Sequence, residues 1–238
     1  MKKFFIHEGK PIEWLDSLLI YLMIGTIFGA RIGHCLFYDW DYFSNHLLEI
    51  ILPFRFDPFQ FVGYRGLASH GGAIAIIIMM WLFSKRITKL PMLWILDRVV
   101  IPTALTGMFI RLGNLMNSEI LGKPTDVAWA FDFVRDSKLS GIPVHPVQLY
   151  EAISYGLIFL FMWWQYWKTG AKGKLGFLFG TFLVLIWSSR FVLEYFKRSQ
   201  GGFETFFGSA LSTGQLLSIP FIIIGLYFVM RNPQKIAV

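Results

Sequence analysis

The sequence contains six stretches that are long and apolar enough to cross a lipid bilayer. A spanning helix needs roughly 20 predominantly apolar residues, whereas the strands of a membrane β-barrel are shorter and alternate with a period of two. The Gly, Ser and Thr residues within the stretches also suit close helix packing in lipid. We therefore predict an all-α fold, a polytopic integral membrane helix bundle with about six transmembrane helices. The stretches cover residues 18–38, 67–83, 93–115, 147–167, 175–191 and 211–230.

The amino-acid composition agrees with a membrane protein. Hydrophobic residues make up 55% of the chain and charged residues only 16%, a balance that a soluble domain of this length could not hide inside one core. No low-complexity segment, soluble appendage or internal repeat interrupts the pattern. We expect one membrane-embedded domain over residues 1–238.

The distribution of Lys and Arg predicts the orientation in the membrane. Short cytoplasmic loops are enriched in these residues. The first, third, fifth and seventh segments outside the spans carry eleven of them, and the alternate, longer segments carry seven among many acids. Both termini are therefore expected in the cytoplasm. A net charge of +7 could also indicate binding to nucleic acid, but the loop pattern accounts for the positive charge. We therefore expect no nucleic-acid partner.

Ionisable and amide residues gather at the expected outer ends of five spans. A charged group inside a membrane costs several kcal/mol unless it is paired or hydrated, so such residues point to function. Salt bridges that hold the helices together remain the structural alternative. Arginine binds phosphate through a planar fork of donors, which favours an anionic lipid headgroup as ligand, and Glu and His can transfer protons. The gathered residues are Arg31, His34, His70, Arg111, Asn114, Asn117, Glu119, His145, Gln148, Glu151, Arg190 and Glu194.

The sequence offers no pattern for a metal or another cofactor. The five histidines are scattered, no HExxH motif is present, and Cys35 is the single cysteine, so neither a metal site nor a disulfide framework is expected. A GxSxG elbow and a P-loop are also absent from the sequence, which disfavours a serine hydrolase and an NTPase. We expect the site to work without a cofactor.

Several ordered motifs at these positions resemble the prolipoprotein diacylglyceryl transferase family, bacterial inner-membrane enzymes that carry out the first modification of lipoproteins. The resemblance covers nearly the whole chain. The motifs are the run from Arg111 to Gly122 (RLGNLMNSEILG), the run from Gly29 to Tyr38 (GARIGHCLFY), Ser69 to Gly72 (SHGG), His145 to Glu151 (HPVQLYE), Arg190 to Lys197 (RFVLEYFK) and Gly214 to Pro220 (GQLLSIP).

The resemblance implies a reaction and its partners. The diacylglyceryl group of phosphatidylglycerol would be transferred to the lipobox cysteine thiol of a prolipoprotein signal peptide, forming a thioether and releasing glycerol 1-phosphate. The resemblance also implies a multi-pass protein of the bacterial inner membrane, active at its periplasmic face. We expect a monomer.

Roles for individual residues follow from the same motifs. Arg111 and Arg190 match the family's essential arginines and are expected to bind the phosphate, and His70 matches the histidine discussed as a base. Asn114 and Glu119 match positions that shape the headgroup pocket. The remaining candidates for substrate binding are Arg31, His145, Glu151 and Glu194. Glu194 is expected to orient Arg190. For His145 and Glu151, a structural role is the alternative.

The chain departs from the family pattern in two places. Family members usually begin with an additional helix that carries a functionally important Tyr, and this sequence starts where that helix should already have ended, so six spans are expected in place of seven. Ile110 also stands where a Gly often precedes the signature arginine. Two other functions stay open at this point: an inactive or truncated phosphatidylglycerol-binding paralogue, and a small-anion transporter, although transporters usually show repeated halves.

Overall fold

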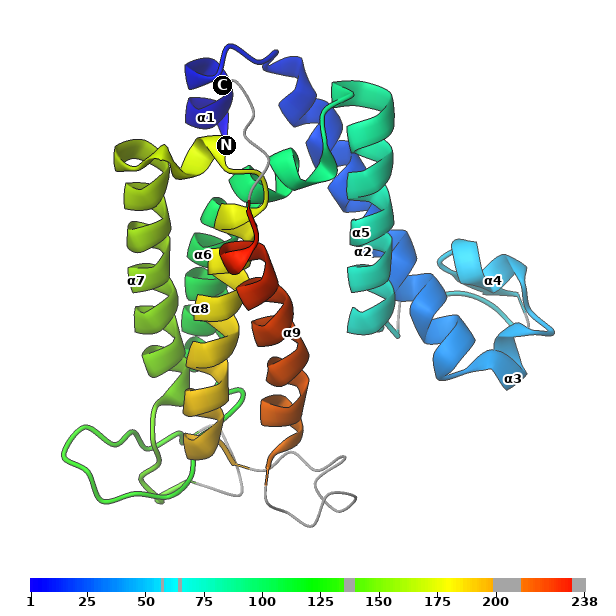
Figure 1. Cartoon of the computed structure of the whole chain (residues 1–238). Coiled ribbons are helices and arrows are strands. Elements are labelled where there is room, and N and C mark those ends of the chain that lie inside the picture. Colours follow the sequence, from blue (N-terminus) through cyan, green and yellow to red (C-terminus); the bar gives the residue numbers. More distant parts are fainter. Residues whose placement is uncertain (57, 64–65, 135–139, 199–210, 233–238) are drawn as a thin grey trace. The chain divides into compact units, whose positions relative to one another are not determined.

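The computed structural model describes residues 1–56, 58–63, 66–134, 140–198 and 211–232. Its internal contacts divide the chain into two units, Met1–Ile95 and Leu96–Val238. Each unit is a set of helices with short connecting elements (Figure 1).

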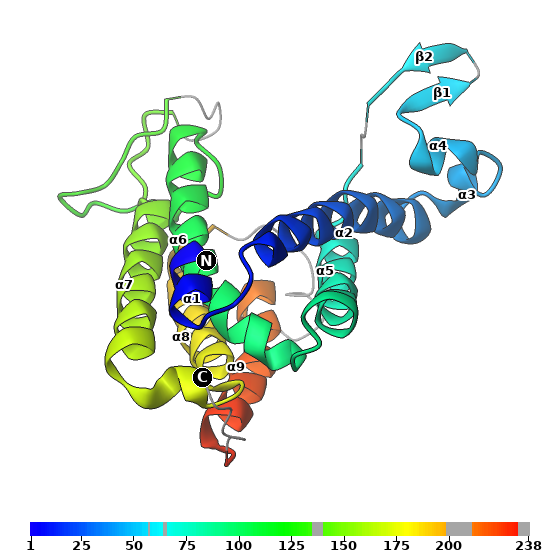
Figure 2. The same cartoon turned by 90° about the horizontal axis from the view of Figure 1, so that it is seen from above.

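The first unit is built on two long helices that cross closely, with a small projecting segment between them in the sequence. We call residues 39–63 the arm; Figure 2 shows it at the end of α2. The elements are α1 (Lys2–His7), α2 (Glu13–Phe37), α3 (Trp40–Phe43), α4 (Leu48–Ile51), β1 (Phe54–Phe56), β2 (Phe59–Phe61), α5 (Ser69–Phe83) and the π-helical turn Ser84–Thr88, after which α6 (Met92–Met116) begins.

The second unit contains most of α6 and three further long helices. In sequence they are α7 (Val147–Lys168), α8 (Phe177–Leu193) and α9 (Thr213–Met230), with 3-10 turns at Gly170–Gly173 and Glu194–Phe196. Helix α8 packs against both α7 and α9, and the Asp97 carboxylate of α6 accepts hydrogen bonds from the amides of Gly176 (2.7 Å) and Phe179 (2.8 Å). Asp97 thus satisfies free N–H groups at the start of α8 and fixes the helix that carries Arg190.

Five of the six predicted membrane helices are confirmed. Within the part of the chain that the structure describes, five helices are long and apolar enough to cross a membrane: Glu13–Phe37, His70–Thr88, Met92–Met116, Phe177–Phe196 and Thr213–Met230. The sixth predicted span is α7, which has 22 residues; its Tyr, Trp and Gln side chains lower its hydropathy. Leu157, Leu160 and Trp164 are exposed along one side of α7, as expected for a helix that faces lipid. The strands and short helices of the arm were not predicted.

Glycines let α2 and α5 approach each other closely. A Cβ atom on Gly33 would lie 2.5 Å from the Gly71 Cα, and one on Gly29 would overlap the Ala75 side chain and lie 2.8 Å from the Gly71 carbonyl oxygen. Small residues at such crossings allow direct backbone contact between membrane helices. The crossing also places Gly71, the neighbour of His70, against α2.

Gly29→Val is expected to destabilise the protein. The new side chain would force α2 and α5 apart, and overpacking of this kind typically costs about 1–3 kcal/mol, which corresponds to a drop of about 2–12 °C in the melting temperature. Thermal melting in detergent or lipid measures the change. Gly113→Val is the matched control, because a Cβ on this helical glycine meets nothing within 4 Å. Equal melting temperatures for the two variants would contradict the expectation.

Candidate active site

A buried carboxylate organises the polar residues of the second unit. Glu151, near the start of α7, is fully buried and forms ion pairs with Arg111 Nε at 3.0 Å and Lys197 Nζ at 2.9 Å. Arg111 comes from the last turns of α6, and Lys197 follows the 3-10 turn after α8. One carboxylate therefore holds two cations from two other elements.

Lys197 is a site residue that the sequence did not reveal. It was counted among the cations of an outer loop, yet it is 6% exposed and pairs with Glu194 (3.1 Å) as well as with Glu151. The backbone around it is fixed by two hydrogen bonds, from Lys123 N–H to the Phe196 carbonyl (2.8 Å) and from Arg198 N–H to the Leu121 carbonyl (3.2 Å). Two sequence signals could have indicated it: Lys197 ends the motif that begins at Arg190, and it stands three residues after Glu194.

The expectation that Glu194 orients Arg190 is not what the structure shows. The α-helix ends at Leu193, and Glu194 begins a 3-10 turn. Residues three apart lie above one another in such a turn, so the Glu194 carboxylate meets Lys197. The spacing of four between Arg190 and Glu194 does not produce an ion pair.

Arg190 is a cation without a counterion among the described residues. Its Nε is buried and lacks a hydrogen-bond partner, and its guanidinium stacks over the Trp187 ring at 5.5 Å. Tyr155, buried on α7, lies near both Arg111 and Arg190. An unpaired guanidinium in a membrane span is costly unless an anion or water meets it. Arg190 is therefore the strongest candidate anion-binding group of this unit.

The run after α6 forms a hydrogen-bonded loop around Glu119. Arg111 Nη1 donates to Asn114 Oδ1 (3.3 Å), and Asn114 Nδ2 donates to the Glu119 carboxylate (2.7 Å). Gln148 Nε2 on α7 donates to the Glu119 carbonyl at a distance of 2.6 Å. Ser118 and Ile120, on either side of Glu119, have φ near 57° and 58°, a left-handed conformation that is unusual for such residues. The backbone thus holds Glu119 in a specific position.

His145 lies in an aromatic cluster beside this network. Its Nδ1 is 3.2 Å from the Tyr150 hydroxyl, which accepts a hydrogen bond from Trp129 Nε1 at 2.7 Å, and its ring packs edge-on against Phe196. Gly122 must stay small here, because a Cβ would lie 2.8 Å from the His145 Cβ. These contacts favour a structural role for His145.

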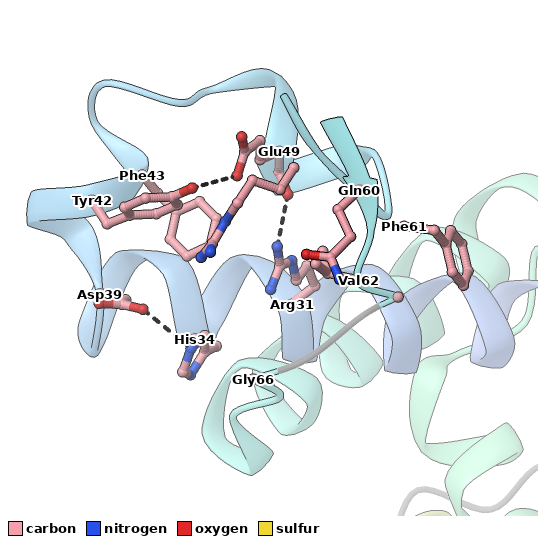
Figure 3. A pocket seen from close by; sticks show the side chains of 12 residues that line it. Arg31, His34, Asp39, Tyr42, Phe43, Glu49, Gln60, Phe61, Val62 and Gly66 are labelled. Carbon is pink, nitrogen blue, oxygen red and sulfur yellow. Dashed lines mark hydrogen bonds and ion pairs between the residues drawn. The ribbon is translucent and has the colours of Figure 1, made fainter. Parts of the chain in front are cut away.

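In the first unit, Arg31 attaches the arm to α2. It is 5% exposed, donates to the carbonyls of Glu49 (2.7 Å) and Ile50 (3.3 Å), and stacks over Phe43. It lies beside a cavity of about 540 Å³ that also has His34, Arg55 and Gln60 in its wall (Figure 3). His34 faces Asp39 at 4.0 Å across the same wall.

Glu49 closes the base of the arm. Its buried carboxylate accepts hydrogen bonds from the Tyr42 hydroxyl (2.8 Å) and the Phe56 amide (3.0 Å). Burial disfavours the charged form, but these two hydrogen bonds and the nearby His46 and Arg55 outweigh it and hold the pKa of Glu49 below its usual range. The same bond to Glu49 raises the pKa of the Tyr42 phenol. The arm is thus anchored by an ionised carboxylate.

His70 stands in the first turn of α5, with an exposed side chain. The predicted site residues therefore fall into the two units. The structure brings Arg111, Asn114, Glu119 and Glu151 into one network of the second unit, and Tyr155 lies near Arg111 and Arg190. Tyr155 was missed, although it lies four residues after Glu151 and thus on the same face of α7.

Comparison with known proteins identifies the family. The sequence profile of the prolipoprotein diacylglyceryl transferase family matches residues 1–231. Proteins named phosphatidylglycerol--prolipoprotein diacylglyceryl transferase are similar: one from Tolumonas auensis is 43% identical over 99% of this chain and 85% of its own length, and one from Bacteroides fragilis is 47% identical over 96% and 82%. A relative with the same name from Chloroherpeton thalassium is 44% identical over 99% of this chain and 82% of its own length. The motifs, the helices and these relatives agree, and the chain belongs to the prolipoprotein diacylglyceryl transferase family.

Proposed function

We propose that this protein transfers the diacylglyceryl group of phosphatidylglycerol to the lipobox cysteine of prolipoproteins. The relatives carry the name of this activity. The observation in the structure that supports it best is Arg190, a guanidinium in a membrane helix whose Nε is buried without a partner. A lipid phosphate supplies the anion that this group lacks.

The proposed reaction is a substitution at the glycerol carbon next to the phosphate. The cysteine sulfur bonds to that carbon, the carbon–oxygen bond to phosphate breaks, and glycerol 1-phosphate leaves with the electron pair. The thiol loses its proton, which makes it a nucleophile. Arg190 stabilises the charge that develops on the departing phosphate, and Arg111, held by Glu151 and Asn114, is the second proposed phosphate ligand.

The proton acceptor and the location are proposed from the resemblance and the loop charges. His70 matches the family's His-Gly-Gly histidine and is the proposed base. Asn114 and Glu119 are proposed to bind the headgroup, and Arg31, His145, Glu151 and Glu194 to support the site as described above. We also propose a multi-pass protein of the bacterial inner membrane that acts as a monomer at the outer face. The excess of Lys and Arg in alternate loops supports this orientation.

Transfer can be measured directly on the purified protein in lipid. Phosphatidylglycerol and a synthetic lipobox peptide are expected to yield a peptide heavier by one diacylglyceryl group, together with glycerol 1-phosphate, and the gene should restore growth of a strain depleted of its own transferase. A peptide with Ser in place of the lipobox Cys should give no product. Failure with every anionic lipid and failure to restore growth would refute the proposed function.

A further inference from the structure

The β-hairpin of the arm has two chemically different faces. Phe54 is paired with Phe61, Phe56 with Phe59, and Arg55 with Gln60. Directly paired residues of an antiparallel ladder lie on the same face, and successive residues of a strand point to opposite faces. The four phenylalanines therefore share one face, which we call the phenylalanine face, and Arg55 and Gln60 share the other.

Side-chain contacts agree with this division. The Phe54 ring lies 5.5 Å from the Phe59 ring and 5.4 Å from the Phe61 ring, and Phe56 lies 6.2 Å from Phe59. On the opposite face, Arg55 lies over the Tyr42 ring at 5.5 Å. Figure 3 shows Gln60 pointing toward Arg31, and Phe61 is also among the residues that line the cavity. The polar face thus covers the cavity, whereas Phe54, Phe56 and Phe59 are not among the residues that line it.

The phenylalanine face is left uncovered. The exposed fractions are 71% for Phe59, 69% for Phe61 and 45% for Phe56. The short helix α4 adds Leu48 and Ile51, exposed by 66% and 58%. The phenylalanine rings, which contact one another, form an exposed apolar surface, and such surfaces mark contacts with a membrane or a partner protein.

The position of the arm in the chain favours lipid as that partner. The arm follows α2, which ends at Phe37, and precedes α5, which begins at Ser69, and both are membrane-spanning helices. The lipid-facing surface of α2 continues to its last residues, because Phe37 is 70% and Tyr38 62% exposed. A segment of this length, tethered at both ends to spanning helices, remains close to the bilayer surface.

We propose that the phenylalanine face of the β-hairpin docks into the boundary between headgroups and acyl chains of the leaflet at which α2 ends. Apolar faces rich in Phe and Leu bind at this depth while polar residues stay in the aqueous layer. The phenylalanine face consists of phenyl rings without polar groups. It therefore suits the fluid apolar layer of a membrane better than a peptide backbone, which needs hydrogen-bond partners. This inference rests on the membrane-spanning fold and not on the proposed transferase activity.

Spin labels on adjacent residues test the docking. Cys35 is the only cysteine and is buried, so Cys35→Ala provides a background for Phe59→Cys and for the matched control Gln60→Cys. The full chain carrying a nitroxide at either site is placed in vesicles of phosphatidylcholine and phosphatidylglycerol. We expect the label at 59 to collide several-fold more with oxygen than with a water-soluble nickel complex, and the label at 60 to show the reverse preference.

Three outcomes would overturn the proposal. Equal access of the nickel complex to both labels would place the phenylalanine face in water. Exclusion of both relaxation agents at 59 would mean that protein covers it, and protection at 59 that arises only on adding a lipobox peptide would make the face a peptide-binding surface. Phe61→Cys repeats the measurement if Phe59→Cys lowers the yield of folded protein, and the transfer assay on the same samples reports separately on the proposed function.

Discussion

Arg190→Ala is expected to reduce diacylglyceryl transfer by about 100-fold or more while leaving the protein folded. Loss of one preorganised donor to a developing negative charge costs about that factor. Folding should not suffer, because Arg190 has no ion pair among the described residues and its buried Nε lacks a partner. Removing an uncompensated charge from a membrane span relieves a cost, so the melting temperature should stay equal or rise.

The transfer rate and the melting temperature are measured on the same samples. Arg198→Ala is the matched control, since Arg198 is an exposed arginine whose backbone N–H makes its hydrogen bond to Leu121; it should keep both values. Arg190→Lys retains the charge without the planar fork and should recover only part of the rate. Full transfer by Arg190→Ala, or loss of rate that merely follows unfolding, would count against Arg190 as a phosphate ligand.

The long helices could be predicted because their length and hydropathy are properties of the local sequence. The prediction of a span at 93–115 matches α6, Met92–Met116, to within one residue at each end. The arm could not be predicted in the same way. Its helices have four residues and its strands three, too short for a periodic pattern to stand out, although the alternation of Phe with polar residues between Phe54 and Phe61 is a strand signal in retrospect.

The chemistry of the candidate site was predicted in type and only partly in its pairings. Residues such as Arg111 and Glu151 stand out because charge inside a span is rare. Spacing along one helix could not show that Glu151 binds cations from two other elements, since that depends on tertiary packing. Arg31 illustrates the same limit: it shares a helix face with His34, yet its guanidinium is bound to carbonyls of the arm.

Glu151→Ala is expected to destabilise the protein more than any other single change at the site. The substitution leaves Arg111, 13% exposed, and Lys197, 6% exposed, without the carboxylate that binds both. Removing one partner of a buried ion pair costs about 3–5 kcal/mol, because the remaining charge stays in a poorly hydrated place. A chain of this size should then melt about 10 °C or more below the parent.

A double-mutant cycle separates this electrostatic cause from simple loss of packing. Lys197→Met removes one of the two cations that Glu151 binds, together with the Lys197–Glu194 ion pair, and keeps an apolar chain of similar length. Glu151→Ala combined with Lys197→Met should therefore be less destabilised than the sum of the single changes. Glu151→Gln keeps the shape without the charge and should fall between parent and Glu151→Ala. If the two changes simply add, Glu151 and Lys197 are not energetically coupled. Because Glu151 fixes Arg111, transfer by Glu151→Gln should also decline at temperatures where the variant is fully folded. Arg190→Ala, in contrast, should lose transfer without losing stability. The two variants thus distinguish Arg190, which is proposed to bind phosphate, from Glu151, which positions Arg111.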